Sequence, residues 1–194
     1  MGHKDDLLEG AKRCLIDIGY ARTTARDIVG VSGTNLASIG YHFGSKDALM
    51  MQAMMAMMEE WGERFMPKGE AGSFSRADAK FSTIWTRLLT LFESDRRLLM
   101  ASFEAFVEAE RNPQLRQLLA GSYATVRDEF GADFLLIAEE LTPSQRRAVG
   151  SVLLALLSGM MAQYLMAPEG MPTGEEITLA FKIIGRALMA GAAE

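Results

Sequence analysis

The sequence predicts an all-α protein, and two observations carry this prediction. Apolar residues recur at spacings of three and four along almost the whole chain, which is the period of an amphipathic helix. No stretch alternates apolar and polar residues for long enough to predict a strand. Because 49% of the 194 residues are hydrophobic and they are spread along the chain, the helices have enough apolar surface to form a folded core.

Three helices are expected at the start of the chain. The first covers about 7–18 and ends at Gly19. Thr24 is placed to cap a short second helix, and Asp27 three residues later completes the capping pattern. Asn35 is placed to cap a third short helix, which runs to about residue 42.

A long fourth helix opens at Ser45 and extends to about residue 65. The stretch 67–73 contains proline and glycine and predicts a loop, as does 168–174. Thr142 caps a later helix, with proline at its first helical position. In all, five helices are expected beyond the fourth, over about 81–92, 98–107, 113–141, 143–168 and 177–188.

The segment 22–49 contains two short helices joined by a glycine-containing turn at 32–34, which is the layout of a helix-turn-helix. The second of these helices is short and carries small residues on its outer side, namely Ala37, Ser38 and Gly40. The major groove of DNA, about 12 Å wide, accepts such a helix, and small residues let its backbone approach the bases. By spacing alone, an ordinary helical corner is the alternative.

The string IGYHFGSKDAL at 39–49, preceded by TTARDI at 23–28, resembles the DNA-binding domain of the TetR (tetracycline repressor) family. The motif covers about 7–50, and the helical layout of 51–194 is compatible with the family. The resemblance implies a three-helix DNA-binding domain at 1–47, followed by a larger helical ligand-binding and dimerisation domain at 48–194.

The same resemblance implies a role for each motif position. The second helix faces a phosphate with its N-terminal N–H groups, and Arg26 reaches the DNA backbone or a base, unless it is an ordinary exposed arginine. The start of the third helix reads base edges, while Tyr41, His42 and Lys46 contact phosphates. The implied DNA-binding residues are Thr24, Arg26, Asn35, Leu36, Ala37, Ser38, Tyr41, His42 and Lys46.

Two positions depart from the family pattern. The family often has an aromatic residue where Gly40 stands and a glycine where Ala37 stands, so Tyr41 is the candidate for the aromatic phosphate contact. Phe43 and Cys14 are expected in the core of the domain rather than at a contact. These departures put the contacts at residue 40 in doubt, but not the fold.

Charge predicts a modest nonspecific affinity for DNA. Residues 1–50 carry six Lys or Arg and six Asp or Glu, a net charge of zero. Residues 22–46 carry three basic residues and one acidic residue, a local net charge of +2. We therefore expect a local positive face and a shallow salt dependence of DNA binding.

Sequence-specific binding by one short helix needs a second copy, because two half-sites in the major groove supply the discrimination. The last two apolar helices are the candidates for a four-helix subunit interface, in which Gly159 and Ala180 permit close approach. Burial of both helices within one chain is the alternative. The candidate interface residues are Leu153, Leu156, Leu157, Met160, Tyr164, Ile177, Phe181, Ile184 and Leu188.

The middle helices are rich in methionine and aromatic residues, which suits an adaptable pocket for an apolar or amphipathic molecule and suits an ordinary core equally well. Such an effector would shift the long fourth helix and thereby the spacing of the two recognition helices. The candidate pocket residues are Trp61, Phe65, Trp85, Phe92, Phe103, Phe106, Tyr123 and Phe130.

Catalysis and metal binding are not expected. One cysteine and two histidines argue against a disulfide framework, a multi-cysteine zinc site and a histidine-rich metal centre. The chain lacks a G-x-S-x-G elbow, a glycine-rich phosphate loop and an H-E-x-x-H motif. Glu104 and Glu108 share a helical face, a pattern common on solvated surfaces. We expect neither enzymatic activity nor a cofactor.

Residues 148–168 carry no charge and are long enough to cross a bilayer. Polar residues and glycines interrupt the stretch, so we expect a helix buried by the protein or by a partner subunit, with no membrane partner. The start of the chain lacks a basic segment followed by an apolar one, which predicts a cytoplasmic protein.

The sequence therefore predicts a ligand-responsive transcriptional regulator, most simply a repressor. It would bind a palindromic DNA operator as a homodimer and be released by a small effector. The alternative is an all-helical small-molecule, lipid-binding or interaction module that does not bind DNA sequence-specifically.

Overall fold

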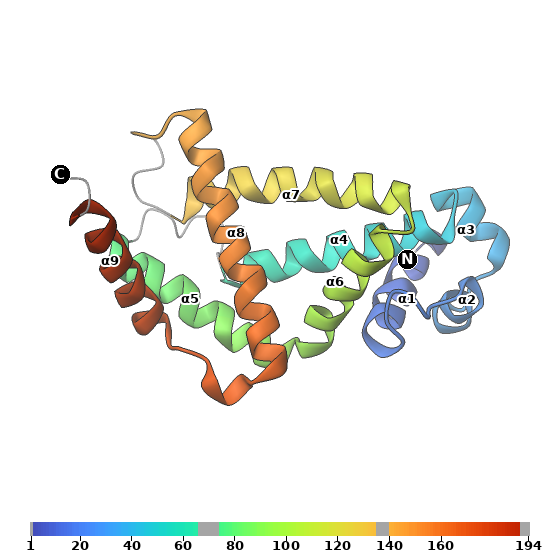
Figure 1. Ribbon diagram of the computed structural model, residues 1–194. Coiled ribbons are helices and arrows are strands. Elements are labelled where there is room, and N and C mark those ends of the chain that lie inside the picture. The colour runs from blue at the N-terminus through green and yellow to red at the C-terminus, as the bar shows by residue number, and fades with distance from the viewer. Residues whose placement is uncertain (1, 66–73, 135–139, 191–194) are drawn as a thin grey trace. The chain divides into compact units, whose positions relative to one another are not determined.

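The computed structural model describes residues 2–65, 74–134 and 140–190, and its regular structure there is entirely helical (Figure 1). This confirms the all-α prediction. The loop expected at 67–73 lies outside the described residues. The helices are α1 His3–Asp17, α2 Ala25–Ser32, α3 Leu36–Phe43, α4 Lys46–Phe65, α5 Ala77–Ser94, α6 Arg96–Ala109, α7 Pro113–Asp133, α8 Pro143–Met166, the 3₁₀ turn η3 Pro168–Gly170 and α9 Gly174–Ala190.

The helix expected over 113–141 is shorter than its apolar pattern predicts. α7 ends at Asp133, and Phe134 already lies beyond it. α8 packs against α7 close to this end, with Arg146 against Gly131.

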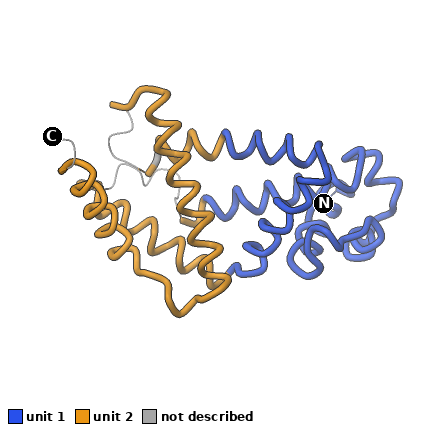
Figure 2. The backbone as a smooth tube through the Cα atoms, viewed as in Figure 1, with its two compact units in different colours: residues 1–62, 95–124 blue, residues 63–94, 125–194 orange. Residues whose placement is uncertain are grey.

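The chain divides into two compact units (Figure 2). The first comprises residues 1–62 and 95–124, and the second comprises 63–94 and 125–194. The first unit therefore contains α1–α3, most of α4, all of α6 and the first part of α7. The boundary expected at residue 47 lies inside this first unit.

One continuous core holds the first unit together. The inner face of α1, with Leu7, Ala11, Cys14 and Leu15, is buried against residues of α2, α3, α4 and α6. Phe43 is also buried there, so the expected core positions of Cys14 and Phe43 are confirmed. Each large apolar side chain removed from water contributes about 1.5–3 kcal/mol to folding, so this core fixes how α2 and α3 sit on α1.

Close helix crossings organise the second unit. α7 and α8 cross closely, with Gly131 against Arg146 and Gly150 against the backbone of Arg127. α5 and α9 run antiparallel. Gly174 at the start of α9 lies against Ser82 and Thr86 of α5, and Phe181 packs on Phe81 with ring centroids 5.2 Å apart. A side chain at these glycines would strike backbone atoms, so glycine is what permits the crossings.

Candidate nucleic-acid interface

α2 begins with a complete reciprocal cap. The backbone N–H and the hydroxyl of Thr24 donate to Oδ2 of Asp27 at 2.8 and 2.7 Å, and the Asp27 N–H donates to the Thr24 hydroxyl at 3.3 Å. These hydrogen bonds hold the pKa of the Asp27 carboxyl below its usual range. Because Asp27 occupies the Thr24 hydroxyl, the donors left for a phosphate at this end are the first helical N–H groups, those of Ala25 and Arg26.

α3 presents one face outward and anchors the other. Ile39 and Phe43 are buried in the core of the first unit. On the opposite side Leu36 is 50% exposed and Tyr41 is 83% exposed. Ala37 and Gly40 lie exposed between them, and a Cβ added at Gly40 would meet no atom within 4 Å. The helix therefore offers an open face with little side-chain bulk at its centre.

The start of α3 is fixed by Asn35. Its Oδ1 accepts hydrogen bonds from the backbone N–H of Ser38 at 3.0 Å and from the Ser38 hydroxyl at 3.2 Å. At the other end, the ring of the half-buried His42 lies edge-to-face with Tyr41, with centroids 4.8 Å apart. The cap and the aromatic pair thus hold both ends of the helix.

Lys46 has structural partners that the sequence did not predict. Its Nζ donates to the carbonyl oxygen of Thr23 at 3.2 Å and lies 3.3 Å from a carboxylate oxygen of Asp47. Lys46 therefore already makes a hydrogen bond and an ion pair within the protein. Its contact with a phosphate stays a prediction, and Lys46 has a second role in joining the start of α4 to the residues before α2.

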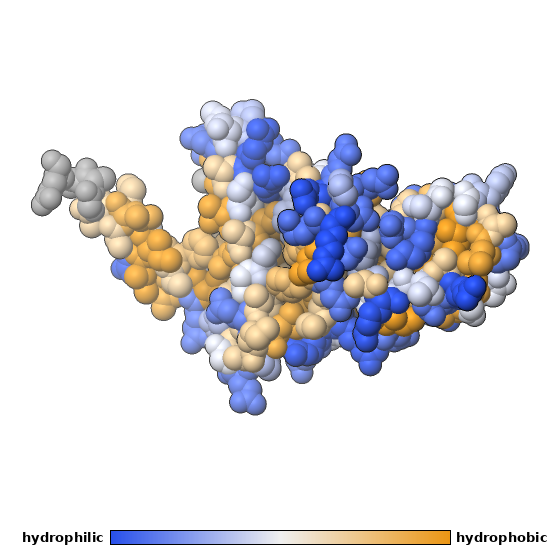
Figure 3. Space-filling model, turned by 45° about the vertical axis from the view of Figure 1, so that its right-hand side comes forward, coloured by the Kyte–Doolittle hydropathy of each residue, from blue (hydrophilic) through white to orange (hydrophobic). Residues whose placement is uncertain are grey.

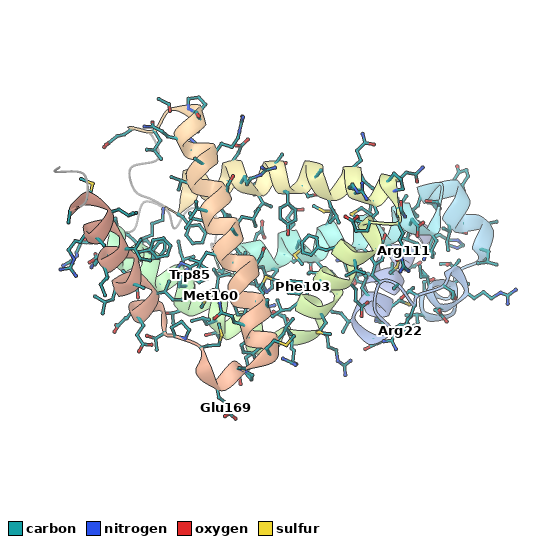
Figure 4. The ribbon with its side chains drawn as sticks, viewed as in Figure 1. Arg22, Trp85, Phe103, Arg111, Met160 and Glu169 are labelled. Carbon is teal, nitrogen blue, oxygen red and sulfur yellow. The ribbon has the colours of Figure 1, made fainter. Side chains whose placement is uncertain are left out.

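Arg22 belongs to this surface but was not among the predicted contacts. It is exposed in the turn directly before Thr23 and Thr24, near the N-terminal helices in Figure 4. The sequence signal was present, because Arg22 is one of the three basic residues that make the 22–46 segment positive. Arg22 and the exposed Arg26 are thus the cations that flank the start of α2.

α6 holds the loop between α1 and α2. The carboxylate of Glu104 accepts a hydrogen bond from the Tyr20 N–H at 2.9 Å and lies against Gly19, which has a φ of +91°. Arg97 of α6 pairs with Asp17 at 3.0 Å. No local sequence signal could reveal these contacts, because they join residues about 80 positions apart.

The residues predicted to line a ligand pocket fall into two sets. In the first unit, Phe106 packs on Phe103 and on Tyr123, with centroids 6.1 and 5.5 Å apart. Trp61 also belongs to that unit. The second unit holds the remainder, Phe65, Trp85, Phe92 and Phe130, all of them buried.

The second-unit set is part of a larger group of rings. Phe134 contacts Phe65, Phe81, Trp85 and Phe130, with centroids between 4.9 and 6.5 Å apart. Phe92 packs separately on Tyr164 at 5.8 Å. A surface pocket of about 340 Å³ also lies in this unit, and its lining includes none of the predicted pocket residues: Ala162, Gln163, Met166, Ala167, Gly170 and Met171.

The predicted interface residues have different surroundings. Leu153, Leu157, Met160 and Ile177 are buried within the chain itself, and their place in a subunit interface stays a prediction. Leu156, Tyr164 and Phe181 are half-buried. Ile184 is 54% exposed and Leu188 is 74% exposed. Other apolar residues exposed on the same two helices are Val152, Met166, Leu179, Ile183 and Met189.

This exposed apolar surface is visible along α9 in Figure 3. α8 is also long and apolar enough to cross a membrane by length and composition, and 33% of that apolar stretch is buried inside the molecule. Both helices thus keep apolar surface that the subunit itself does not cover. Within the described ranges, no group of three His, Cys, Asp or Glu residues is placed to hold a metal ion.

Two family models match the chain. Residues 7–53 match the family described as bacterial regulatory proteins, tetR family. Residues 77–188 match the family described as BetI-type transcriptional repressor, C-terminal. The first match contains α2 and α3 with their caps, and the second runs from the start of α5 into α9.

Individual proteins match over most of the chain. It is 26% identical over 172 residues to the HTH-type nicotine-responsive transcriptional repressor HdnoR of Paenarthrobacter nicotinovorans, covering 86% of this chain and 85% of that protein. The multidrug binding protein EbrR, solved in complex with imidazole, has a TM-score of 0.66 at 25% identity, covering 90% of this chain and 84% of EbrR. A transcriptional regulator from Rhodococcus sp. Rha1 shares the fold, with a TM-score of 0.69 at 16% identity and coverage of 94% and 96%.

Proposed function

Because the chain belongs to the TetR family of bacterial transcriptional regulators, we propose that it represses transcription as a homodimer bound to a palindromic operator in the cytoplasm. Regulators of this family are DNA-binding proteins rather than enzymes, and they respond to small molecules. The alternative of a helical module without DNA binding is therefore not favoured. The repressor assignment rests on the likeness to HdnoR and to the BetI-type family.

The outward face of α3 carries this proposal. Leu36, Ala37, Gly40 and Tyr41 are exposed together, while Ile39 and Phe43 fix the helix to the core. Small residues let the backbone approach base edges, Leu36 suits a thymine methyl group, and the Tyr41 hydroxyl suits a phosphate oxygen. Thr24, Arg26, Asn35, Ser38, His42 and Lys46 complete the proposed contact set, and we add Arg22 to it.

The test is binding to duplex DNA selected from a random pool, measured by fluorescence anisotropy. Tyr41→Ala lowers affinity about tenfold or more, because a hydrogen bond to a charged phosphate is lost in each subunit. Tyr41→Phe isolates the hydroxyl. Val107→Ala is the matched control, because Val107 is exposed on α6 and lies outside the proposed contact set. Unchanged binding in Tyr41→Ala, or failure to select any sequence, refutes the proposed interface.

The effector is proposed to be a small apolar or amphipathic molecule. HdnoR is named as nicotine-responsive and EbrR as a multidrug binding protein, so related regulators respond to small organic compounds. The aromatic residues of the two units supply apolar surface for such a molecule. Of these, Phe103 and Phe106 are on α6, the helix that holds the loop before α2 through Glu104. A ligand that displaces α6 thereby displaces the support of the helix-turn-helix.

A further inference from the structure

Trp85 of α5 has a buried hydrogen-bond donor that nothing accepts. Its side chain is completely buried inside the second unit (Figure 4). Its indole Nε1 is buried and has no acceptor within the described part of the chain. Buried tryptophan N–H groups usually find an acceptor, so one without it calls for an explanation.

The surroundings of Trp85 explain why no acceptor is supplied. Phe81 and Phe134 lie next to it, with ring centroids 6.2 and 6.3 Å away, and Phe181 and Phe130 extend the group. Phenyl rings carry no conventional acceptor. By contrast, the buried Thr178 hydroxyl of the same unit donates to the Gly174 carbonyl at 2.7 Å. Trp85 is thus a single fixed donor within an otherwise apolar aromatic group.

We propose, on the premise of the effector-responsive function above, that the effector is a flat aromatic molecule with a hydrogen-bond acceptor at its edge. Its ring packs among Phe81, Phe134 and their neighbours, since aromatic rings associate edge-to-face or offset. Its acceptor, a ring nitrogen or a carbonyl oxygen, receives the Trp85 N–H. Met160 and Met161, buried on α8 of the same unit, are side chains that repack readily around an inserted ring.

A donor in an apolar site discriminates between ligands of equal shape. A molecule with the acceptor pairs with the indole, whereas a molecule of the same outline without it leaves the donor unpaired. Quinoline and naphthalene are such a pair, because they differ by one ring nitrogen in place of a C–H group. Quinoline is neutral at pH 8, so the comparison involves no charge.

The experiment measures the dissociation constants of both probes for the full chain by calorimetry. Hydrophobicity favours naphthalene, so the quantity compared between proteins is the ratio of the two constants. Trp85→Phe keeps the aromatic packing and removes the donor, so this ratio shifts toward naphthalene by roughly two- to tenfold. Thr178→Val is the matched control, since it removes a buried donor of the same unit whose acceptor the Gly174 carbonyl already supplies, and it leaves the ratio unchanged.

A second measurement uses the unaltered protein and does not depend on the folding of a variant. Two tryptophans give two indole N–H signals in a ¹⁵N-correlated NMR spectrum, and the loss of one signal in Trp85→Phe assigns both. Quinoline moves the Trp85 signal downfield, as expected for a new hydrogen bond, and naphthalene does not. The proposal is overturned if neither probe binds, if the ratio is the same in all three proteins, or if the two probes shift the signal alike.

Selection of an operator with the same preparation separates this inference from the proposed function. A protein that binds DNA but neither probe remains a regulator and lacks the aromatic effector site. A protein that selects no DNA loses the regulatory function itself, whatever the two probes do.

Discussion

Gly19 and Gly33 both have positive φ angles, +91° and +68°, but only Gly19 faces another side chain. A Cβ at Gly19 would strike the Glu104 carboxylate, whereas a Cβ at Gly33 would meet nothing within 4 Å. Gly33→Ala is therefore expected to cost about 1–2 kcal/mol in backbone strain alone. Gly19→Ala is expected to cost at least about 1 kcal/mol more, because overpacking is added to strain.

Urea unfolding of the two variants measures this difference. Gly19→Ala in a Glu104→Ala background provides the control, since the clash is then removed and only the strain remains. Equal costs for Gly19→Ala and Gly33→Ala would mean that Glu104 does not lie against this loop in solution.

The cap between Thr24 and Asp27 predicts a pH-dependent contribution to stability. The folded protein holds the Asp27 pKa below its usual value, so the ionised carboxylate stabilises the fold. That contribution is fully present above the unfolded pKa, near 4, and disappears as the pH falls through the lowered folded value. The difference in melting temperature between the protein and its Asp27→Ala variant is therefore largest near neutral pH and shrinks toward about pH 3. A difference that stays constant with pH contradicts this role.

At the residue scale, local contacts were predictable and distant ones were not. The caps at Thr24, Asn35 and Thr142 follow from residue type and position, because the partner lies three residues away. The contacts of Lys46 with Thr23 and of Glu104 with Tyr20 join separate elements. The family resemblance made the lysine a DNA contact, and the spacing of Glu104 from Glu108 made the glutamate a solvated surface group.

At the element scale, the α7–α8 crossing predicts opposite effects for two glycines of α7. Gly131 lies against Arg146, whereas a Cβ at Gly121 would meet nothing within 4 Å. Gly131→Ala forces the helices apart and is expected to cost about 1–3 kcal/mol. Gly121→Ala is expected to gain about 0.5–1 kcal/mol, because alanine is the better helix former. Chemical denaturation measures both, and a stabilising Gly131→Ala would rule out the close crossing.

Helix identity was predictable from periodicity, but the covered face of α8 was not. α8 is apolar on nearly all sides, so the spacing of its leucines does not distinguish the face turned inward from the face left open. The sequence pattern assigned Leu153, Leu157 and Met160 to the interface, and all three are buried within the chain. The end of α7 was missed because its apolar pattern continues beyond Asp133, where the helix ends.

At the scale of the whole molecule, the exposed side of α9 predicts the oligomeric state. Ile184→Asp combined with Leu188→Asp puts charges on apolar surface that a partner subunit would cover, and is expected to convert the dimer to monomer. Light scattering coupled to gel filtration measures the mass. Val107→Asp is the control, because Val107 is 68% exposed and lies on α6.

The double variant should also lose operator affinity, since one recognition helix is insufficient for tight binding. A dimer that persists unchanged in the double variant places the subunit interface elsewhere.

The family and the regulatory role were predictable because a contiguous motif carries them. The strings at 23–28 and 39–49 are local, and the matched family regions extend that assignment to most of the chain. The ligand site was not predictable in the same way. Apolar periodicity assigns all the aromatic residues to one interior. In the structure, Phe103, Phe106 and Tyr123 belong to the first unit, and the group around Phe134 belongs to the second.

Two side chains contact the segment that links α1 to α2. The Glu104 carboxylate of α6 accepts a hydrogen bond from the Tyr20 N–H, and the Lys46 ammonium at the start of α4 donates one to the Thr23 carbonyl. α4 and α6 therefore both contact the segment that leads into α2 and α3, the helices proposed to bind DNA. If the proposed effector response reaches α2 and α3 through these two contacts, a single substitution at Glu104 or Lys46 is expected to weaken it only partially, because the other contact remains. Substituting both residues together is expected to abolish the effect of the effector on operator binding.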